Sequence, residues 1–76
     1  MTGKLPRVEA VQVIRVLERI GFVLVRQSGS HRIYKNKEGK RVTVPFHSGR
    51  TLHPKVLRNI LDDAGLEVET LKGLLQ

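Results

Sequence analysis

The sequence predicts an α+β fold with the element order α-β-β-β-α and a short additional helix at the C-terminus. Residues 10–20 and 54–64 place apolar side chains at helical spacing, and residues 22–45 contain three short β-branched segments separated by turn residues. This order is typical of one antiparallel three-stranded sheet with helices on one face and solvent on the other. At 76 residues, with no internal repeat or linker, the chain is expected to form a single domain over residues 1–76.

The first helix is predicted to begin at Ala10, shortly after Pro6, and to stop at Gly21, which tolerates the left-handed conformation that ends many helices. Its charged residues fall on the face opposite the apolar ones. The apolar residues that follow the 3.6-residue period are Ala10, Val13, Ile14, Leu17 and Ile20.

Three strands are predicted at residues 22–26, 31–35 and 41–44. Ser28-Gly29 is typical of a turn between the first two strands, and residues 36–39 form the next hairpin connection. Pro45 lacks a backbone donor, which suits the end of a strand or an edge.

A polar loop over residues 46–53 is expected to lead into a second helix that has Pro54 at its first position and ends at Ala64-Gly65. Its core stripe is predicted to be Val56, Leu57, Ile60 and Leu61. A short final helix is predicted from the spacing of Thr70, Leu71, Leu74 and Leu75.

Positive charge is concentrated in the first part of the chain. Residues 1–60 carry 13 Lys and Arg against 3 Asp and Glu, whereas residues 61–76 carry 1 against 4. The stretch 26–58 holds 9 basic residues against Glu38 alone. Such a one-sided distribution is typical of a protein that binds a polyanion, above all nucleic acid, because a merely solubilising surface usually mixes both signs.

The composition also bounds the compartment and the cofactors. The chain has no cysteine, which excludes disulfides and thiolate metal sites and fits a reducing cytosol. No apolar run approaches the ~20 residues that span a bilayer, and Arg7 and Glu9 interrupt any signal-peptide core. Metal-binding histidines normally converge with carboxylates or thiolates, and the only acidic pair, Asp62-Asp63, lies at the far end of the second helix. We therefore expect a cytoplasmic protein with no membrane contact, no metal and no cofactor.

The tripeptide Gly29-Ser30-His31 supplies the candidate catalytic residue. Imidazole, with an unperturbed pKa of about 6.5, both accepts and donates protons near neutrality, and His31 enters a strand directly after a tight turn. Gly29 lets a phosphate approach the backbone closely, and Arg26 and Arg32 are candidates to neutralise charge. The alternative is a partly buried sheet histidine, because His31 shares strand parity with Ile33.

A metal-free site that cuts a phosphodiester favours RNA over DNA, because RNA carries its own nucleophile in the 2′-hydroxyl. His47, at the exit of the third strand, is a candidate second proton donor or substrate contact, with an ordinary loop residue as the alternative. His53, directly before Pro54, is expected to start a helix or lie on the surface.

The start of the second helix is a candidate site for the RNA backbone. Lys55 and Arg58 add fixed charge to the free N–H groups there, although two exposed solubilising residues would have the same spacing. Tyr34 is the only aromatic residue of the second strand, too little for a stacking platform. We therefore expect recognition of shape and backbone.

Five segments together resemble the HicA family of toxin ribonucleases, the small partners in HicA–HicB toxin–antitoxin pairs. The resemblance extends from Lys4 to Leu71, and the order and spacing of its segments are specific. The segments are Leu5-Pro6-Arg7, residues 17–22, Gly29-Ser30-His31, Val42-Thr43-Val44-Pro45 with His47, and residues 57–65.

The resemblance implies a fold like that of the double-stranded RNA-binding domain and the activity of an mRNA interferase. It also implies that His31 is the essential histidine and that a HicB-type antitoxin with an acidic surface blocks the basic face. One departure concerns the second helix, where the family usually has a Gly-Thr step and this chain has Lys55-Val56. That change adds a cation and removes a small, hydroxyl-bearing start.

Three functions follow from these observations. The leading hypothesis is a metal-independent endoribonuclease acting on mRNA, with His31 as general acid or base and Arg26, Gly29, Ser30, Arg32, Lys55 and Arg58 as RNA-binding residues. The runner-up is a non-catalytic double-stranded RNA-binding module, in which the helix cations matter more than the histidine. The third is a protein-interaction domain whose charge serves only an acidic partner.

Overall fold

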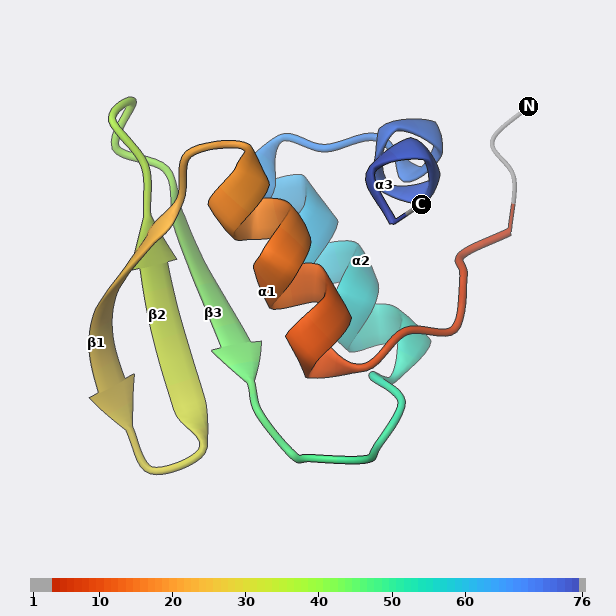
Figure 1. Ribbon diagram of the computed structural model, residues 1–76, viewed down its shortest axis with the longest axis horizontal. Coiled ribbons are helices and arrows are strands. Elements are labelled where there is room, and N and C mark those ends of the chain that lie inside the picture. Colours follow the sequence, from red (N-terminus) through yellow and green to blue (C-terminus); the bar gives the residue numbers. More distant parts are fainter. Residues whose placement is uncertain (1–3, 76) are drawn as a thin grey trace.

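The computed structural model describes residues 4–75, and these residues confirm the predicted α+β class (Figure 1). Residues 1–3 and 76 of the expected single domain lie outside the described part of the chain. The elements are α1 (Ala10–Arg19), β1 (Val23–Ser28), β2 (His31–Lys35), β3 (Arg41–Pro45), α2 (Pro54–Ala64) and α3 (Val68–Leu74). The strands form one antiparallel sheet in the order β1-β2-β3.

All three helices lie on the same side of the sheet, as Figure 1 shows. Both α1 and α2 pack against β3, which is the edge strand of the sheet nearest the helices. The other face of the sheet is open, as the sequence predicts. Among residues 4–75, none of the helices combines the length and apolar character that a bilayer crossing requires.

The strand register assigns each side chain of β2 and β3 to one of the two faces. Tyr34 pairs with Val42, and both are buried under the helices. Because neighbouring residues of a strand point to opposite faces, His31 lies with its register partner Pro45 on the open face.

The core is built from the apolar stripes of the helices and the inward positions of β2 and β3. The predicted residues Ile20 and Val56 are only half-buried at its margin. Its buried side chains are Val8, Ala10, Val13, Ile14, Val16, Leu17, Phe22, Tyr34, Val42, Val44, Leu57, Ile60, Leu61, Ala64, Val68 and Leu71.

The first strand departs from its predicted bounds. Phe22 precedes β1 rather than opening it, and its ring is buried while its N–H donates to the carbonyl of Leu17 at 2.9 Å. All six residues of β1 are exposed, because β1 is an edge strand beyond the area that the helices cover. The apolar run at residues 22–25 therefore contributes one core residue and then an exposed edge.

Local hydrogen bonds account for the helix starts. Gln12 Oε1 accepts from the N–H of Glu9 at 2.8 Å just before α1. At α2, His53 Nδ1 accepts from the N–H of Lys55 at 3.0 Å, and Pro54 occupies the first turn. The prediction that His53 starts a helix is thereby confirmed.

Candidate functional site

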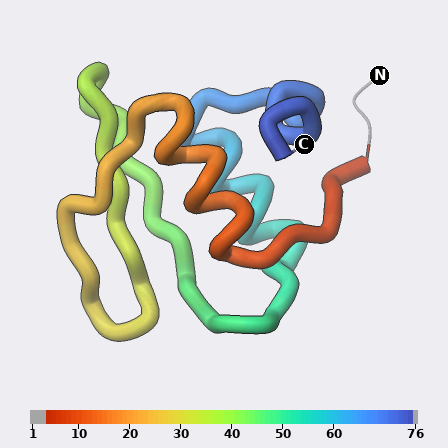
Figure 2. Tube along the Cα trace, in the orientation of Figure 1, coloured from red at the N-terminus to blue at the C-terminus, as the bar shows by residue number. Residues whose placement is uncertain are grey.

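One end of the sheet gathers most of the residues that the sequence singles out. The β1–β2 turn, the end of β3, the loop over residues 46–53 and the beginning of α2 all lie at this end (Figure 2). A main-chain hydrogen bond joins two of them, because the N–H of Phe46 donates to the carbonyl of Ser30 at 2.6 Å. The Gly29-Ser30-His31 turn is thus fixed directly to the segment that carries His47.

His31 is the first residue of β2 and is exposed on the open face, so the alternative of a partly buried histidine does not hold. Gly29, in the preceding turn, has a φ of +57°, and a Cβ placed on it would meet nothing within 4 Å. The turn therefore leaves room for a ligand to approach the backbone beside the imidazole.

The two arginines near His31 lie on different faces of the sheet. Arg26 pairs with Ile33, which shares the open face with His31. Arg32 follows His31 in β2 and therefore points to the helix side, where its guanidinium lies 4.0 Å from the centre of the Phe46 ring. Of the two, only Arg26 shares the face of the imidazole.

Arg32 instead braces the start of the loop. Its Nε is buried and has no hydrogen-bond partner among the described residues, and its guanidinium stacks on Phe46. A cation–π contact of this kind contributes about 0.5–2 kcal/mol, depending on its desolvation. Together with the bond from Phe46 to Ser30, it holds the beginning of the loop against the sheet.

The loop itself surrounds a hollow of ≈ 300 Å³ next to the end of β3. Apolar side chains form part of its wall, and His47, Arg50 and His53 bring polar groups to it; the full lining is Pro45, His47, Arg50, Thr51, Leu52, His53 and Val56. The loop is tied to the N-terminal segment, because the N–H of Leu52 donates to the carbonyl of Val8 at 2.8 Å.

Arg50 is the residue of this hollow that sequence reasoning missed. The polar loop was recognised, but nothing in its composition sets Arg50 apart from an ordinary surface cation. Its position between two histidines, ahead of a helix start with further cations, was the available signal.

The beginning of α2 carries Lys55 and Arg58, both exposed. Three positions apart on a helix, they share a face. The first turn of α2 has no acidic residue, so nothing local offsets the partial positive charge of the helix end. The adjoining N-terminal segment carries the acidic residue Glu9, whose backbone pairs with that of Thr51 in an isolated antiparallel β-bridge.

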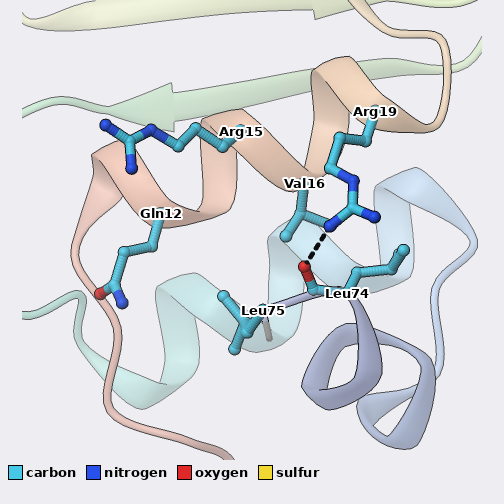
Figure 3. A pocket seen from close by; sticks show the side chains of 6 residues that line it. All are labelled: Gln12, Arg15, Val16, Arg19, Leu74 and Leu75. Atoms are coloured by element: carbon cyan, nitrogen blue, oxygen red, sulfur yellow. Dashed lines mark hydrogen bonds between the residues drawn. The ribbon is translucent and has the colours of Figure 1, made fainter.

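A second hollow, of ≈ 250 Å³, lies between α1 and α3 rather than near His31 (Figure 3). Its lining includes Arg15, Arg19, Leu74 and Leu75, and Arg19 Nη1 donates to the carbonyl of Leu74 at 2.8 Å. This bond anchors the end of α3 to α1, which gives the hollow a structural explanation.

Burial raises the pKa of the Tyr34 hydroxyl above its ordinary value of 10.0, and the nearby Arg32 opposes that shift only in part. Tyr34 is 1% exposed, so it belongs to the core rather than to a ligand surface. Within residues 4–75, no group of three His, Asp or Glu side chains comes together as a metal-binding cluster.

A family model described as the HicA toxin of bacterial toxin–antitoxin systems matches residues 11–66. The matched region runs from the first turn of α1 past the end of α2, and so includes the whole sheet, His31, the loop with His47 and both cations of α2. No curated protein matches the chain.

Proposed function

Because the chain belongs to the HicA toxin family, and is therefore the toxin of a toxin–antitoxin system, we propose that it is a metal-independent endoribonuclease that cleaves mRNA. The observation that carries this proposal is the placement of His31. Its imidazole is exposed on the open face, on the same face as Arg26 and directly after a turn that leaves space beside Gly29.

The chemistry needs only the substrate's own hydroxyl and two proton transfers. The 2′-oxygen forms a bond to the adjacent phosphorus while the bond from phosphorus to the 5′-oxygen breaks, which leaves a 2′,3′-cyclic phosphate and a 5′-hydroxyl. One group takes the proton of the 2′-hydroxyl, and another gives a proton to the departing 5′-oxygen. His31 performs one of these transfers, and positioned donors stabilise the charge on the phosphoryl oxygens.

His47 is our proposed second proton-transfer group. Its loop is joined to the His31 turn through the bond from Phe46 to Ser30, so the two histidine-bearing segments are held at a fixed separation. The exposure of His47 leaves it accessible to a substrate lying across the end of the sheet. Its alternative role is a substrate contact without proton transfer.

The RNA backbone is proposed to lie against Arg26, Gly29 and Ser30 and to continue to Lys55 and Arg58 at the start of α2. For Arg32, the stack on Phe46 favours a positioning role over a direct RNA contact. The departure from the usual Gly-Thr step fits this picture, because Lys55 is exposed and Val56 is half-buried in the wall of the hollow. The chain thereby gains a phosphate contact in place of a hydroxyl.

The proposed partner is a HicB-type antitoxin whose acidic surface covers the basic end of the molecule. The proposed place of action is the cytoplasm, where mRNA is translated. The formal net charge of +7 supports both the substrate and the partner.

The test is RNA cleavage by purified protein in the presence of EDTA. We expect His31→Ala to lower the cleavage rate at least about 10²-fold, the usual contribution of general acid–base catalysis, with the fold and RNA binding retained. Lys37→Ala, an exposed cation in the β2–β3 turn at the other end of the sheet, is the matched control and should cleave normally.

The same assay separates the alternatives. His47→Ala should remove one limb of the pH–rate profile if His47 transfers a proton, and should raise only KM if it merely contacts substrate. Full cleavage by His31→Ala would contradict the assignment. Tight RNA binding by the native protein with no cleavage would instead identify a non-catalytic RNA-binding module.

A further inference from the structure

The edge strand β1 exposes apolar side chains to an unusual degree. Val23, Leu24 and Val25 are 60%, 48% and 49% exposed, although each is large and apolar. Because the sheet order is β1-β2-β3, β1 pairs only with β2, and its other side carries unpaired N–H and C=O groups. An exposed apolar edge of this kind is a template for another strand.

The usual protections of an edge strand are largely missing at this position. Residues 23–25 contain neither a charge nor a proline, and the first charged residue of β1 is Arg26. A β-bulge between Leu24 and Arg26 is the one irregularity of the edge. Val25, which lies at the bulge between Leu24 and Arg26, has an exposed side chain.

The charge of the residues around β1 indicates which kind of strand would pair with its free edge. Residues 23–45, which form the sheet and its turns, carry six Lys and Arg against the single acidic residue Glu38. A second copy of the chain, with a formal net charge of +7, would bring like charges together across the new strand pair. An apolar strand with acidic residues matches both the side chains and the charge.

We propose that β1 is the docking site for an extended segment of a partner protein, a strand with alternating apolar and acidic residues that pairs with the free edge and extends the sheet. β1 ends at Ser28, the register partner of His31, so a strand paired along β1 reaches the turn that carries the candidate catalytic histidine. Such a strand would tether an inhibitor beside the site. This inference rests on the proposed function, because it describes the partner as an inhibitor of the proposed catalytic site.

The test uses a synthetic ten-residue peptide of alternating Val and Glu, titrated into ¹⁵N-labelled protein and followed by NMR. We expect shifts confined to β1 and its turn, with amide protons of residues 23–28 becoming protected from exchange. A peptide with Lys in place of Glu, and one interrupted by a central proline, should bind at least about tenfold more weakly.

A pair of matched variants locates the contact. Val25→Glu, in the edge strand, should weaken binding of the acidic peptide about tenfold, whereas Val11→Glu, at the exposed valine of α1, should leave it unchanged. If Val25→Glu fails to fold, Val23→Glu takes its place. Equal binding of the native protein and the β1 variant would overturn the proposal, as would self-association of the protein through β1.

The cleavage proposal and the docking proposal are tested independently of each other. If His31-dependent cleavage is found but the peptide does not bind at β1, only the docking proposal is overturned. If the peptide binds at β1 but the protein does not cleave RNA, the docking proposal is supported and the proposed enzyme activity is contradicted.

Discussion

At the scale of single residues, the placement of the two arginines shows what sequence can and cannot give. Alternation from His31 assigns Arg32 to the opposite face, and the structure agrees. Simple alternation from Val23 would assign Arg26 to the helix side. The bulge between Leu24 and Arg26 moves Arg26 to the open face, and no residue in that stretch signals a bulge. His31 could be singled out from the sequence as a candidate catalytic residue, whereas the placement of Arg26 on the same face depended on a backbone irregularity.

Tyr34 gives a pH-dependent test of the core at the same scale. Because burial raises the pKa of its hydroxyl, the folded state holds the proton more tightly than the unfolded chain does. The resulting stabilisation is fully present below the unfolded pKa of 10.0 and is lost as the pH rises through the folded value.

The measurement is the free energy of unfolding from urea denaturation between pH 8 and 11, with pH points chosen on both sides of the ordinary tyrosine pKa of about 10. The native protein should lose more stability over that range than Tyr34→Phe, which keeps the ring and lacks the titrating proton. Parallel pH profiles for the two proteins would show that the hydroxyl does not titrate differently in the fold.

At the scale of elements, the helices were more predictable than the strands. Both long helices combine apolar periodicity with recognisable ends, and the predicted α2 bounds match the observed Pro54–Ala64. In α1 the helix ends at Arg19, with Ile20 as its cap, one residue before the predicted limit. The first strand was misplaced because Phe22 and the three residues after it form one apolar run. Which part of that run is buried depends on how far the helices extend over the sheet, and this is a tertiary property.

Two glycines in or next to helices should respond to alanine in opposite directions. Gly65 ends α2 in the left-handed conformation, with a φ of +73° that L side chains rarely adopt. The end of the Lys40 side chain lies near the position of an added Cβ but is flexible and can move away. Because of this φ, Gly65→Ala should lower the free energy of unfolding by about 1 kcal/mol.

Gly73 lies within α3, and a Cβ there would meet nothing within 4 Å. Gly73→Ala should raise stability by about 0.5–1 kcal/mol, because alanine loses less backbone entropy in a helix. Chemical denaturation of both variants beside the native protein gives the comparison. A destabilised Gly73→Ala would show that α3 does not behave as a continuous helix.

At the scale of the whole molecule, charge is divided between the two ends of the chain. Nine of the 14 basic residues belong to the sheet, its loops and the start of α2, and four more precede the sheet, whereas the acidic excess belongs to the end of α2 and to the segment that includes α3. Composition alone gave this division. The convergence of the β1–β2 turn and the loop over 46–53 required the fold, because the long-range bond from the Phe46 N–H to the Ser30 carbonyl brings these two segments together, and α2 follows directly from the loop.

RNA binding by this basic end should weaken with added salt, because each phosphate contact releases condensed counterions. Measured in the His31→Ala background to keep the RNA intact, Lys55→Ala should reduce the slope of log K against log salt by about 0.7, the value for one single-strand contact. Lys72→Ala, on α3 beside Glu69, should leave the slope unchanged. Equal slopes for all three proteins would place the RNA elsewhere.

The bond between the Phe46 N–H and the Ser30 carbonyl joins the two histidine-bearing segments of the candidate site through main-chain atoms. Both atoms belong to the main chain, so no side-chain replacement short of proline at position 46 removes the donor. This link between the two histidine-bearing segments should therefore persist through most side-chain substitutions at positions 30 and 46. Arg50 and Thr51, which line the hollow, contribute no atom to this bond, so we expect substitutions there to leave the spacing of the two histidine-bearing segments unchanged.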